Sequence, residues 1–248
     1  MKPSRWVAVW VASVLSMGCG RATQPAPRTM GDASRPAHAV EAPAPSPSPP
    51  AARHDWPEGE TQPAPPPPAG VAVATFAGGC FWCMEAAFEA LPGVSAVLSG
   101  YTGGPELHPS YEAVSNHGTG HAEAIRVLYD PARVRYGQLL DLFWRRIMPT
   151  GRDQAFADQG HQYRSAIFVH DAAQRAEAER SRQAIIDSGR FNGEGPITTT
   201  VEDAPVFWVA EDYHQDFYRT HPDRYNGYHE HSGRREYLRA HWGPDAAY

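Results

Sequence analysis

The sequence predicts an α+β domain over residues 71–248, preceded by a segment that cannot build a core of its own. From Gly70 onward, segments with strand-like and helix-like spacing of apolar residues follow one another closely. Several gaps between them are of hairpin length, which favours an α+β arrangement. By contrast, 14 of the 24 prolines lie between Gly20 and Gly70, where large apolar residues are almost absent.

The composition fits a protein with one packed core and argues against a nucleic-acid partner. The chain has 248 residues, of which 42% are hydrophobic, enough for one or two domains. Its formal net charge is −6 and its isoelectric point is about 6.0, so no basic excess would attract phosphates. The three cysteines, Cys19, Cys80 and Cys83, are too few for a disulfide scaffold.

Residues 1–19 are typical of an export signal. Lys2 and Arg5 give a positive start, and the apolar stretch that follows is too short to span a bilayer as a helix. Cys19, directly after this stretch, resembles the acylation site of bacterial lipoproteins, although Ser16 stands where that pattern usually has Leu. We expect an exported protein of the bacterial cell envelope or periplasm, lipid-anchored at Cys19. The alternative is a cleaved signal peptide in which Cys19 is incidental.

Residues 20–70 are predicted to be a disordered linker rich in Pro and Ala. A segment with so few large apolar residues cannot bury enough surface to offset the entropy lost on ordering. Its proline runs, such as the four prolines at 65–68, favour an extended polyproline conformation. Such a spacer would hold a folded domain away from a membrane anchor.

The first half of the domain is predicted to alternate strands and helices. Residues 71–77 are typical of a buried strand, which Gly78-Gly79 ends, and residues 80–91 carry apolar side chains at three- and four-residue steps. Pro92-Gly93 ends that helix. We then expect, in chain order, a strand over 94–99, a loop over 100–104, a short helix over 111–114 and an alternating strand over 122–129.

The second half is predicted to continue in the same way. An amphipathic helix is expected over 136–148, a strand over 165–170 and a long polar-faced helix over 171–188. Residues 197–201 and 206–209 could be edge strands. Residues 225–248, rich in His, Arg and Tyr, are predicted to be a solvated tail packed on the domain, with no assigned function.

The motif Gly-Gly-Cys-Phe-Trp-Cys at 78–83 is the sharpest chemical signal in the chain. A cysteine in the first turn of a helix meets unpaired N–H groups and the positive end of the dipole. Both effects should lower the pKa of Cys80 and favour its thiolate. Cys83 lies one turn further on the same face, at about 5–6 Å between Cβ atoms. A disulfide needs about 3.5–4.5 Å, so a modest movement should close the bond.

Several interpretations of this cysteine pair remain open on these residues alone. The pair could serve a redox enzyme that uses Cys80 directly, a thioredoxin-like dithiol oxidoreductase, half of a zinc site, or simply a buried core. The aromatic Phe81 and Trp82 stand where the thioredoxin family usually has small or Pro-containing pairs. No histidine has a finger-like spacing to the cysteines, which weakens the zinc interpretation.

The chain resembles the A-type peptide methionine sulfoxide reductases through a series of ordered segments. They span nearly all of residues 71–248 and are GCFWCME at 79–85, PGV at 92–94, GYTGG at 100–104, YEAV at 111–114, TGHAEA at 119–124, QYRSAI at 162–167 and AEDYHQ at 210–215. The resemblance implies a two-layer α+β sandwich, related to the ferredoxin-like arrangement, with a mixed, mainly antiparallel sheet and flanking helices. It implies reduction of methionine-S-sulfoxide, free or in proteins, as repair of oxidative damage, without a metal or organic cofactor.

The same resemblance implies roles for individual residues. Cys80 would be the nucleophile, and Phe81 and Trp82 an apolar wall for the substrate methyl group. Glu123 would protonate the sulfoxide oxygen, which requires burial to raise its pKa. Two tyrosines and one aspartate would complete the pocket: Tyr111, Tyr163 and Asp158.

Each of these residues also has a plain structural interpretation. Glu123 alone would be read as part of an exposed strand face, and the aromatic residues as core or core-edge residues. The neighbourhood of Asp158 departs from the family pattern, since Ala157 and His161 replace its usual residues. Ile147-Met148 before Pro149 likewise replaces a usual His-Asp pair. The pocket rim could therefore differ.

The resemblance also implies how the enzyme is recycled. Cys80 would become a sulfenic acid, Cys83 would condense with it to a disulfide, and thioredoxin or an envelope equivalent would reduce that disulfide. Many family members relay the disulfide through cysteines near the C-terminus, but this chain has none after Cys83.

The leader makes a testable prediction about lipidation. When cells that produce this protein are labelled with a fatty acid, we expect label on the wild-type chain and none on Cys19→Ser, because only the thiol at that position can be acylated. An unlabelled wild-type protein in the cytosol would contradict the prediction.

Overall fold

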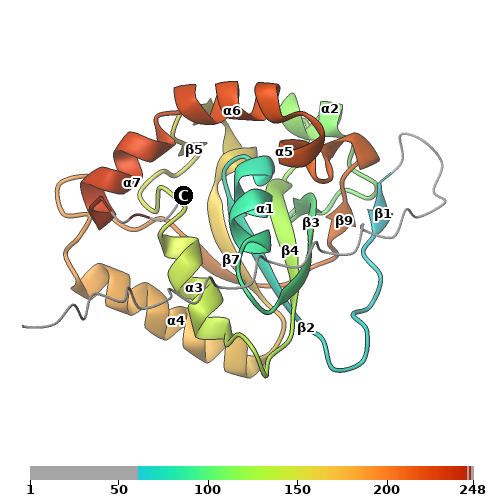
Figure 1. Ribbon diagram of the computed structural model, residues 1–248, viewed down its shortest axis with the longest axis horizontal. Helices are drawn as coiled ribbons and strands as arrows, with labels where there is room; N and C mark the ends of the chain where they lie inside the picture. The colour runs from blue at the N-terminus through green and yellow to red at the C-terminus, as the bar shows by residue number, and fades with distance from the viewer. Residues whose placement is uncertain (1–60, 245, 247–248) are drawn as a thin grey trace, which may run out of the picture. The chain divides into compact units, whose positions relative to one another are not determined.

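The computed structural model describes residues 61–244 and Ala246, which fold around a seven-stranded sheet (Figure 1). In order across the sheet, the strands are β1 (Gln62–Pro63), β9 (Trp208–Val209), β3 (Val94–Thr102), β4 (Ala122–Tyr129), β2 (Ala72–Gly78), β7 (Ser165–Val169) and β8 (Thr200–Asp203). All neighbours pair antiparallel except β7 and β8. The prediction of a mixed, mainly antiparallel sheet is confirmed.

Helices flank this sheet. Those of the described residues are α1 (Phe81–Glu89), α2 (Tyr111–Ser115), α3 (Tyr136–Trp144), α4 (Ala172–Asp187), α5 (Phe217–Thr220), α6 (Pro222–His231) and α7 (Arg234–Trp242). Figure 1 shows α1 in front of the sheet, α3 and α4 together below it, and α5, α6 and α7 along the top and left of the view. A small hairpin, β5 (Gln154–Ala155) with β6 (Asp158–Gln159), lies outside the main sheet.

The core fixes α1 against the central strands. Phe76 of β2 is fully buried, and its ring lies 5.3 Å from that of Phe88 in α1 and 5.1 Å from that of Phe143 in α3. Complete burial of one such side chain contributes about 1.5–3 kcal/mol, so this aromatic cluster anchors both helices firmly. The N-terminus of α1 is thereby held at the end of β2, next to β4.

Several element boundaries differ from the sequence prediction, most clearly those of β3, α3 and β8, which begins at Thr200 rather than at residue 197. Strand β3 continues through Thr102, whereas residues 100–104 were predicted to be a loop. The reason is pairing with β4, in which Tyr101 lies opposite Glu123. Helix α3 ends at Trp144 rather than at residue 148.

The prediction of a disordered linker over residues 20–70 is wrong for residues 61–63. Gln62 and Pro63 form β1 and pair with β9, and Thr61 is buried with its hydroxyl donating to the Pro109 carbonyl at 2.9 Å. Two backbone pairings and one buried side chain suffice to order a proline-rich segment that has no apolar periodicity. The leader and the rest of the linker, residues 1–60, lie outside the described residues.

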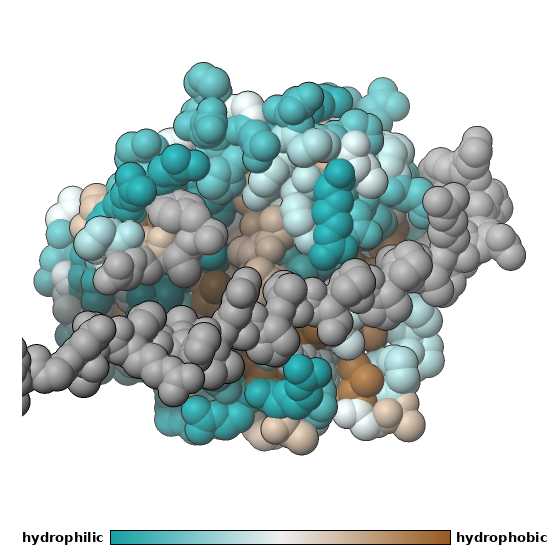
Figure 2. Space-filling model, viewed as in Figure 1, coloured by the Kyte–Doolittle hydropathy of each residue, from teal (hydrophilic) through white to brown (hydrophobic). Residues whose placement is uncertain are grey.

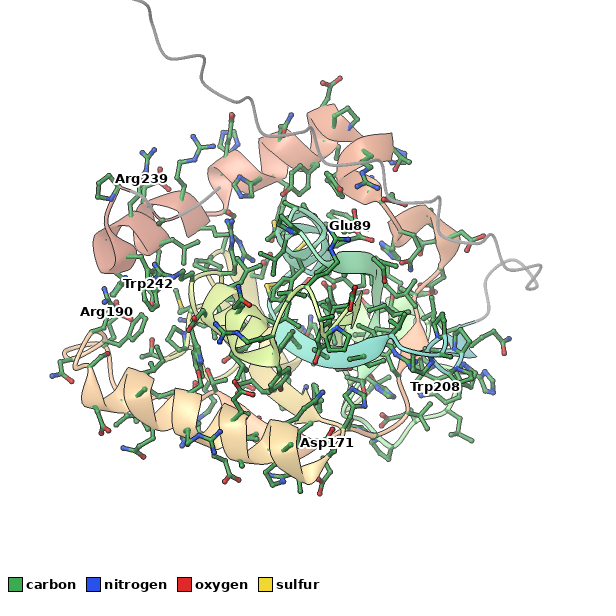
Figure 3. All side chains as sticks on the ribbon, turned by 60° about the horizontal axis from the view of Figure 1, so that its bottom comes forward. Glu89, Asp171, Arg190, Trp208, Arg239 and Trp242 are labelled. Atoms are coloured by element: carbon green, nitrogen blue, oxygen red, sulfur yellow. The ribbon has the colours of Figure 1, made fainter. Side chains whose placement is uncertain are left out.

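The C-terminal segment packs on the domain, as predicted, and it does so as two helices. Arg190, in the turn after α4, places its guanidinium 4.2 Å from the ring of Trp242 in α7, and Figure 3 shows the two side by side. Leu238 of α7 is fully buried. Seen from the direction of Figure 1, α6 and α7 present mostly hydrophilic residues, while hydrophobic residues are visible toward the middle of this face (Figure 2). Within residues 61–244, no helix is long and apolar enough to cross a membrane.

The position of Thr61 yields a prediction about stability. We expect Thr61→Val, which keeps the shape but removes the donor to Pro109, to lower the free energy of unfolding by about 1–2 kcal/mol, measured by urea denaturation. Thr200→Val, at an exposed position of β8, is the control and should change it by less than about 0.5 kcal/mol. Equal stability of the two variants would show that residues 61–63 do not pack on the domain.

Candidate active site

A tight turn between β2 and α1 presents Cys80. Gly79 has a φ of +85°, and a Cβ built on it would lie only 2.6 Å from the Cβ of Ala155, so both the conformation and the space favour glycine. Cys80 follows as the N-cap of α1, and the N–H of Cys83 donates to its carbonyl at 3.2 Å. The structure confirms that the cysteine pair lies where a strand, β2, is followed by a helix, α1.

The predicted site residues meet in one small pocket of about 240 Å³. Its walls come from β4, from α1 and α2, from the segment around β6, and from α6. The lining residues are Cys80, Phe81, Trp82, Tyr111, Glu123, Asp158, Tyr163, Arg224 and Tyr228. Seven of these were candidates from sequence, and the eighth candidate, Cys83, contacts Cys80 from one turn along α1.

Glu123 is a buried acid at the bottom of this site. Its side chain is 3% exposed, and the Phe81 N–H donates to its Oε2 at 3.0 Å. Burial raises the pKa of Glu123 to about 8, so the group carries its proton at neutral pH. The exposed strand face that Glu123 alone would have suggested is wrong, because α1 covers this face of β4. The expectation of a pKa raised by burial agrees with the structure.

Cys80 behaves differently from the expectation of a low pKa. Burial raises the pKa of its thiol, and the neighbouring Cys83 and the carboxyl of Glu123 raise it further. The first N–H of the helix, that of Phe81, is donated to Glu123 and not to the Cys80 sulfur. Desolvation therefore outweighs the helix dipole, and the Cys80 thiol keeps its proton at neutral pH.

Cys83 is the more acidic member of the pair. A hydrogen bond with Cys80 lowers its pKa, and the Arg234 guanidinium acts in the same direction against the effect of burial. Both cysteines are free and buried. The two thiols are thus in direct contact but unequal in environment.

Phe81 and Trp82 line the pocket with apolar rings. The Trp82 ring stacks on Phe217 of α5 at 3.7 Å between centroids, and its Nε1–H donates to His214 Nδ1 at 3.2 Å. The Phe81 ring is buried, 4.9 Å from that of His214. Burial lowers the pKa of His214 to about 4, so the ring is neutral and its proton sits on Nε2, facing Glu211.

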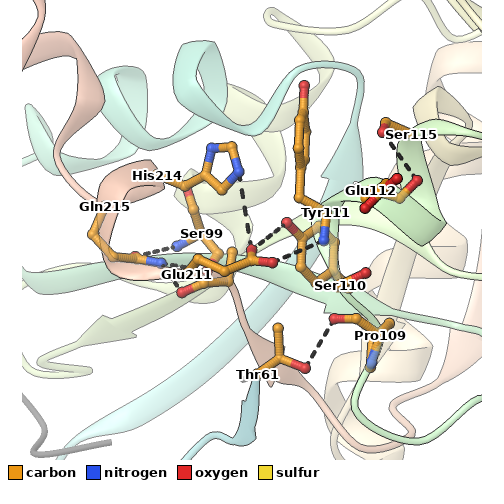
Figure 4. A network of polar contacts seen from close by, with 12 residues as sticks. Thr61, Ser99, Pro109, Ser110, Tyr111, Glu112, Ser115, Glu211, His214 and Gln215 are labelled. Carbon is orange, nitrogen blue, oxygen red and sulfur yellow. Dashed lines mark hydrogen bonds and ion pairs between the residues drawn. The ribbon is translucent and has the colours of Figure 1, made fainter. Parts of the chain in front are cut away.

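The Glu211 carboxylate joins Tyr111 and His214 in one polar network (Figure 4). Glu211 accepts a 2.9 Å hydrogen bond from the Tyr101 hydroxyl and a 2.8 Å bond from the Tyr111 N–H. The His214 Nε2 lies 4.0 Å from the same carboxylate. Glu211 therefore positions the start of α2, and with it the Tyr111 side chain, beside the pocket.

The polar residues opposite Cys80 are half-buried. Burial raises the pKa values of Tyr111 and Tyr163, so both keep their hydroxyl protons and can donate hydrogen bonds. Asp158 accepts a hydrogen bond from the Tyr228 hydroxyl, and burial raises its pKa as well. The structure therefore places Asp158 in the pocket despite the unusual residues around it.

Arg224 and Tyr228 were not among the residues predicted from sequence. Both come from α6, four residues apart and hence on one helix face. The four-residue spacing of Arg224 and Tyr228 was the one sequence feature that could have placed them on a common face. The helix has no apolar stripe, so that spacing did not stand out. In the described part of the chain, no three His, Cys, Asp or Glu side chains gather closely enough to hold a metal ion.

The fold and this pocket define a thiol-dependent oxidoreductase, and comparisons with known proteins identify its family. Residues 72–246 match the family described as peptide methionine sulfoxide reductase, and the chain belongs to that family. It is an oxidoreductase that reduces methionine sulfoxide.

Individual relatives agree with this assignment. Peptide methionine sulfoxide reductases MsrA from Ligilactobacillus salivarius and Bacillus licheniformis are each 47% identical to it, over 68% and 69% of this chain and 96% and 93% of theirs. The methionine sulfoxide reductase A structure of Corynebacterium diphtheriae superimposes with a TM-score of 0.60 at 29% identity, covering 62% of this chain and 77% of that one.

The buried acid predicts a specific dependence on pH. Because the raised pKa keeps Glu123 protonated below about pH 8, the single-turnover rate should fall as pH rises through that value, even though Cys80 then ionises more readily. Glu123→Gln should lower the single-turnover rate by about 10²- to 10⁴-fold and abolish the fall in rate above about pH 8. The exposed Glu112→Gln serves as control. A wild-type rate that keeps rising above pH 8 would exclude Glu123 as the acid.

Proposed function

We propose that this enzyme reduces the S epimer of methionine sulfoxide, free or in proteins, with Cys80 as nucleophile and Cys83 as resolving cysteine. The observation that carries the proposal is the meeting of Cys80 with a protonated Glu123 in one small pocket, with Cys83 in contact behind it. The preference for the S epimer rests on the resemblance to the A-type reductases.

The first step transfers oxygen from substrate to enzyme. A sulfoxide sulfur is electrophilic, but its oxygen leaves only when it is protonated or strongly hydrogen-bonded. Glu123 supplies the proton, and the hydroxyls of Tyr111 and Tyr163 donate hydrogen bonds to the oxygen. The Cys80 sulfur attacks the sulfoxide sulfur and gives up two electrons, and the thiol proton replaces the one that Glu123 donates. The protonated oxygen passes to the Cys80 sulfur as its bond to the substrate sulfur breaks, methionine leaves, and Cys80 becomes a sulfenic acid.

The apolar wall orients the substrate for this attack. The methyl group of the sulfoxide is its only small apolar substituent, and the stacked Trp82 with Phe81 offers it a rigid apolar surface. Trp82 cannot swing away easily, because it is fixed by Phe217 on one face and by His214 at its indole N–H. The wall therefore selects the orientation in which oxygen faces Glu123.

The second step converts the sulfenic acid of Cys80 into a disulfide. The Cys83 sulfur attacks the sulfenic sulfur of Cys80, a disulfide forms, and the hydroxyl leaves as water with a proton. Contact between the two thiols and the lowered pKa of Cys83 both support this step. Cys80 and Cys83 are the cysteines of the described residues, so we assign direct attack on this disulfide to the reductant. We assign that role to a thioredoxin-type dithiol.

Export and lipid anchoring at Cys19 belong to the same proposal. The positive start, the short apolar stretch and the cysteine that follows it support an envelope location. A proline-rich spacer would let the reductase domain reach oxidised proteins at some distance from the membrane.

The role of Cys83 gives a quantitative test. With thioredoxin as reductant, Cys83→Ser should release about one equivalent of methionine per enzyme molecule and then stop, because thioredoxin needs a disulfide to attack. Cys80→Ser should release none. The burst is measured on a Cys19→Ser background, in which no other thiol can substitute, and the stalled Cys83→Ser protein should label with a sulfenic acid reagent.

Two outcomes would contradict the assignment. Continuous turnover of Cys83→Ser with thioredoxin would remove Cys83 from the resolving role. No methionine from wild-type protein, together with reduction of insulin-type disulfides, would favour the thioredoxin-like dithiol oxidoreductase instead.

A further inference from the structure

The two cysteines line two different cavities. The 240 Å³ substrate pocket is lined by Cys80 and not by Cys83. A second cavity of about 460 Å³ is lined by Cys83 and not by Cys80, between α1, the end of α3, α6 and α7. Nothing in the chemistry of sulfoxide reduction requires this second cavity.

The second cavity has an apolar floor that leads to the Cys83 sulfur. Cys83, Ala86 and Ala90 line it at helical intervals along one face of α1, and Leu91 continues that face. Small side chains at these positions leave the cavity open. On its other side stand Tyr225 of α6 and a group of arginines that includes Arg234.

Arg234 is an unusual feature of this cavity. It is 2% exposed, and its Nη1 donates to the Arg146 carbonyl, whereas its Nε and Nη2 have no hydrogen-bond partner among the described residues. No carboxylate in residues 61–244 lies within 4 Å of it. A Cβ on Gly79 would lie 3.3 Å from Nη2, which places the guanidinium beside the turn that carries the cysteines.

A buried cation without an anionic partner is costly unless an anion arrives during function. The Arg234 guanidinium also lies 4.2 Å from the centre of the Phe156 ring, and its charge lowers the pKa values of both Asp158 and Cys83. Of these two acids, only Cys83 lines the second cavity. Thiol–disulfide exchange forms thiolates at each step. The arrangement therefore suits a site in which thiolates attack and leave.

We propose that the second cavity admits the nucleophilic cysteine of a thioredoxin-type protein, which attacks the Cys83 sulfur of the oxidised enzyme beside Arg234. This inference rests on the proposed function, because it concerns the Cys80–Cys83 disulfide formed there. The two-electron reductant is the dithiol of the partner protein.

The exchange balances as follows. The partner's thiolate forms a disulfide with Cys83 while the Cys80–Cys83 bond breaks, and Cys80 leaves as a thiolate inside the substrate pocket. The partner's second thiol then attacks its own sulfur in the mixed disulfide, releases the Cys83 thiolate and leaves the partner oxidised. Two protons taken up by the enzyme complete the step. Sulfoxide and reductant thus use separate entrances.

A trapped intermediate tests which sulfur is attacked. The Cys19→Ser protein, which keeps Cys80 and Cys83, is oxidised with diamide. It is then mixed with thioredoxin whose resolving cysteine is changed to Ser. We expect the mixed disulfide on Cys83, identified by mass spectrometry of the digested complex. A mixed disulfide on Cys80 would overturn the proposal. Because diamide forms the disulfide without substrate, this result does not depend on sulfoxide reduction.

A blocked cavity tests the entrance. Ala86→Trp should slow reduction of the diamide-oxidised enzyme by thioredoxin at least tenfold and change single-turnover methionine release less than about twofold. Ala176→Trp, an equal change at an exposed position of α4, should alter neither rate. Normal reduction of Ala86→Trp, or an equal loss of both rates, would overturn the proposal. Absence of methionine release from wild type would instead count against the proposed function.

Substitutions that remove or keep the positive charge of Arg234 test its part in the exchange. Arg234→Met should slow reduction by thioredoxin at least tenfold and shift the pH dependence of Cys83 alkylation to higher pH, while Arg234→Lys should keep most of the rate. If Arg234→Met is folded, as judged by its circular dichroism, and reacts normally, the guanidinium plays no part. The trapping result stands even if this variant does not fold.

Discussion

The burial of the Glu123 carboxyl against the N-terminus of α1 is the constraint on which the rest of the site depends. It requires that α1 be pressed onto β4, which the Phe76, Phe88 and Phe143 cluster achieves. It also directs the first helical N–H to the carboxyl rather than to the Cys80 sulfur. Burial thus raises the pKa values of both Glu123 and Cys80, so both groups hold their protons at neutral pH.

The C-terminal helices complete a site that the sheet and α1 only begin. Phe217 fixes Trp82, Tyr228 hydrogen-bonds to Asp158, and Arg234 stands beside the cysteine turn. Glu211 and His214, just before these helices, brace the opposite wall. In this chain the C-terminal region therefore supplies rings and charges around the cysteine pair.

Whether an element could be predicted from the sequence depends on whether a local pattern of apolar residues marks it. Local spacing identified β2, β4, α1 and α4, because each carries its own apolar pattern. Strands of two residues, such as β1, exist only through pairing with distant segments, and no local pattern marks them. Helix α6 has no buried face to create a periodic stripe, so Arg224 and Tyr228 escaped detection. The neighbours Cys80 to Cys83 were visible in one motif, but the sign of the Cys80 pKa shift was not, since it depends on burial by residues far away in the chain.

The neutral state of Cys80 has a consequence for survival in oxidising surroundings. Peroxides attack thiolates, and a thiolate oxidised beyond the sulfenic stage is lost to the enzyme. A buried thiol whose ionisation is suppressed offers peroxide little to react with while the pocket is empty. The raised pKa of Cys80 should therefore slow its reaction with peroxide, which favours an enzyme that works where oxidants are present.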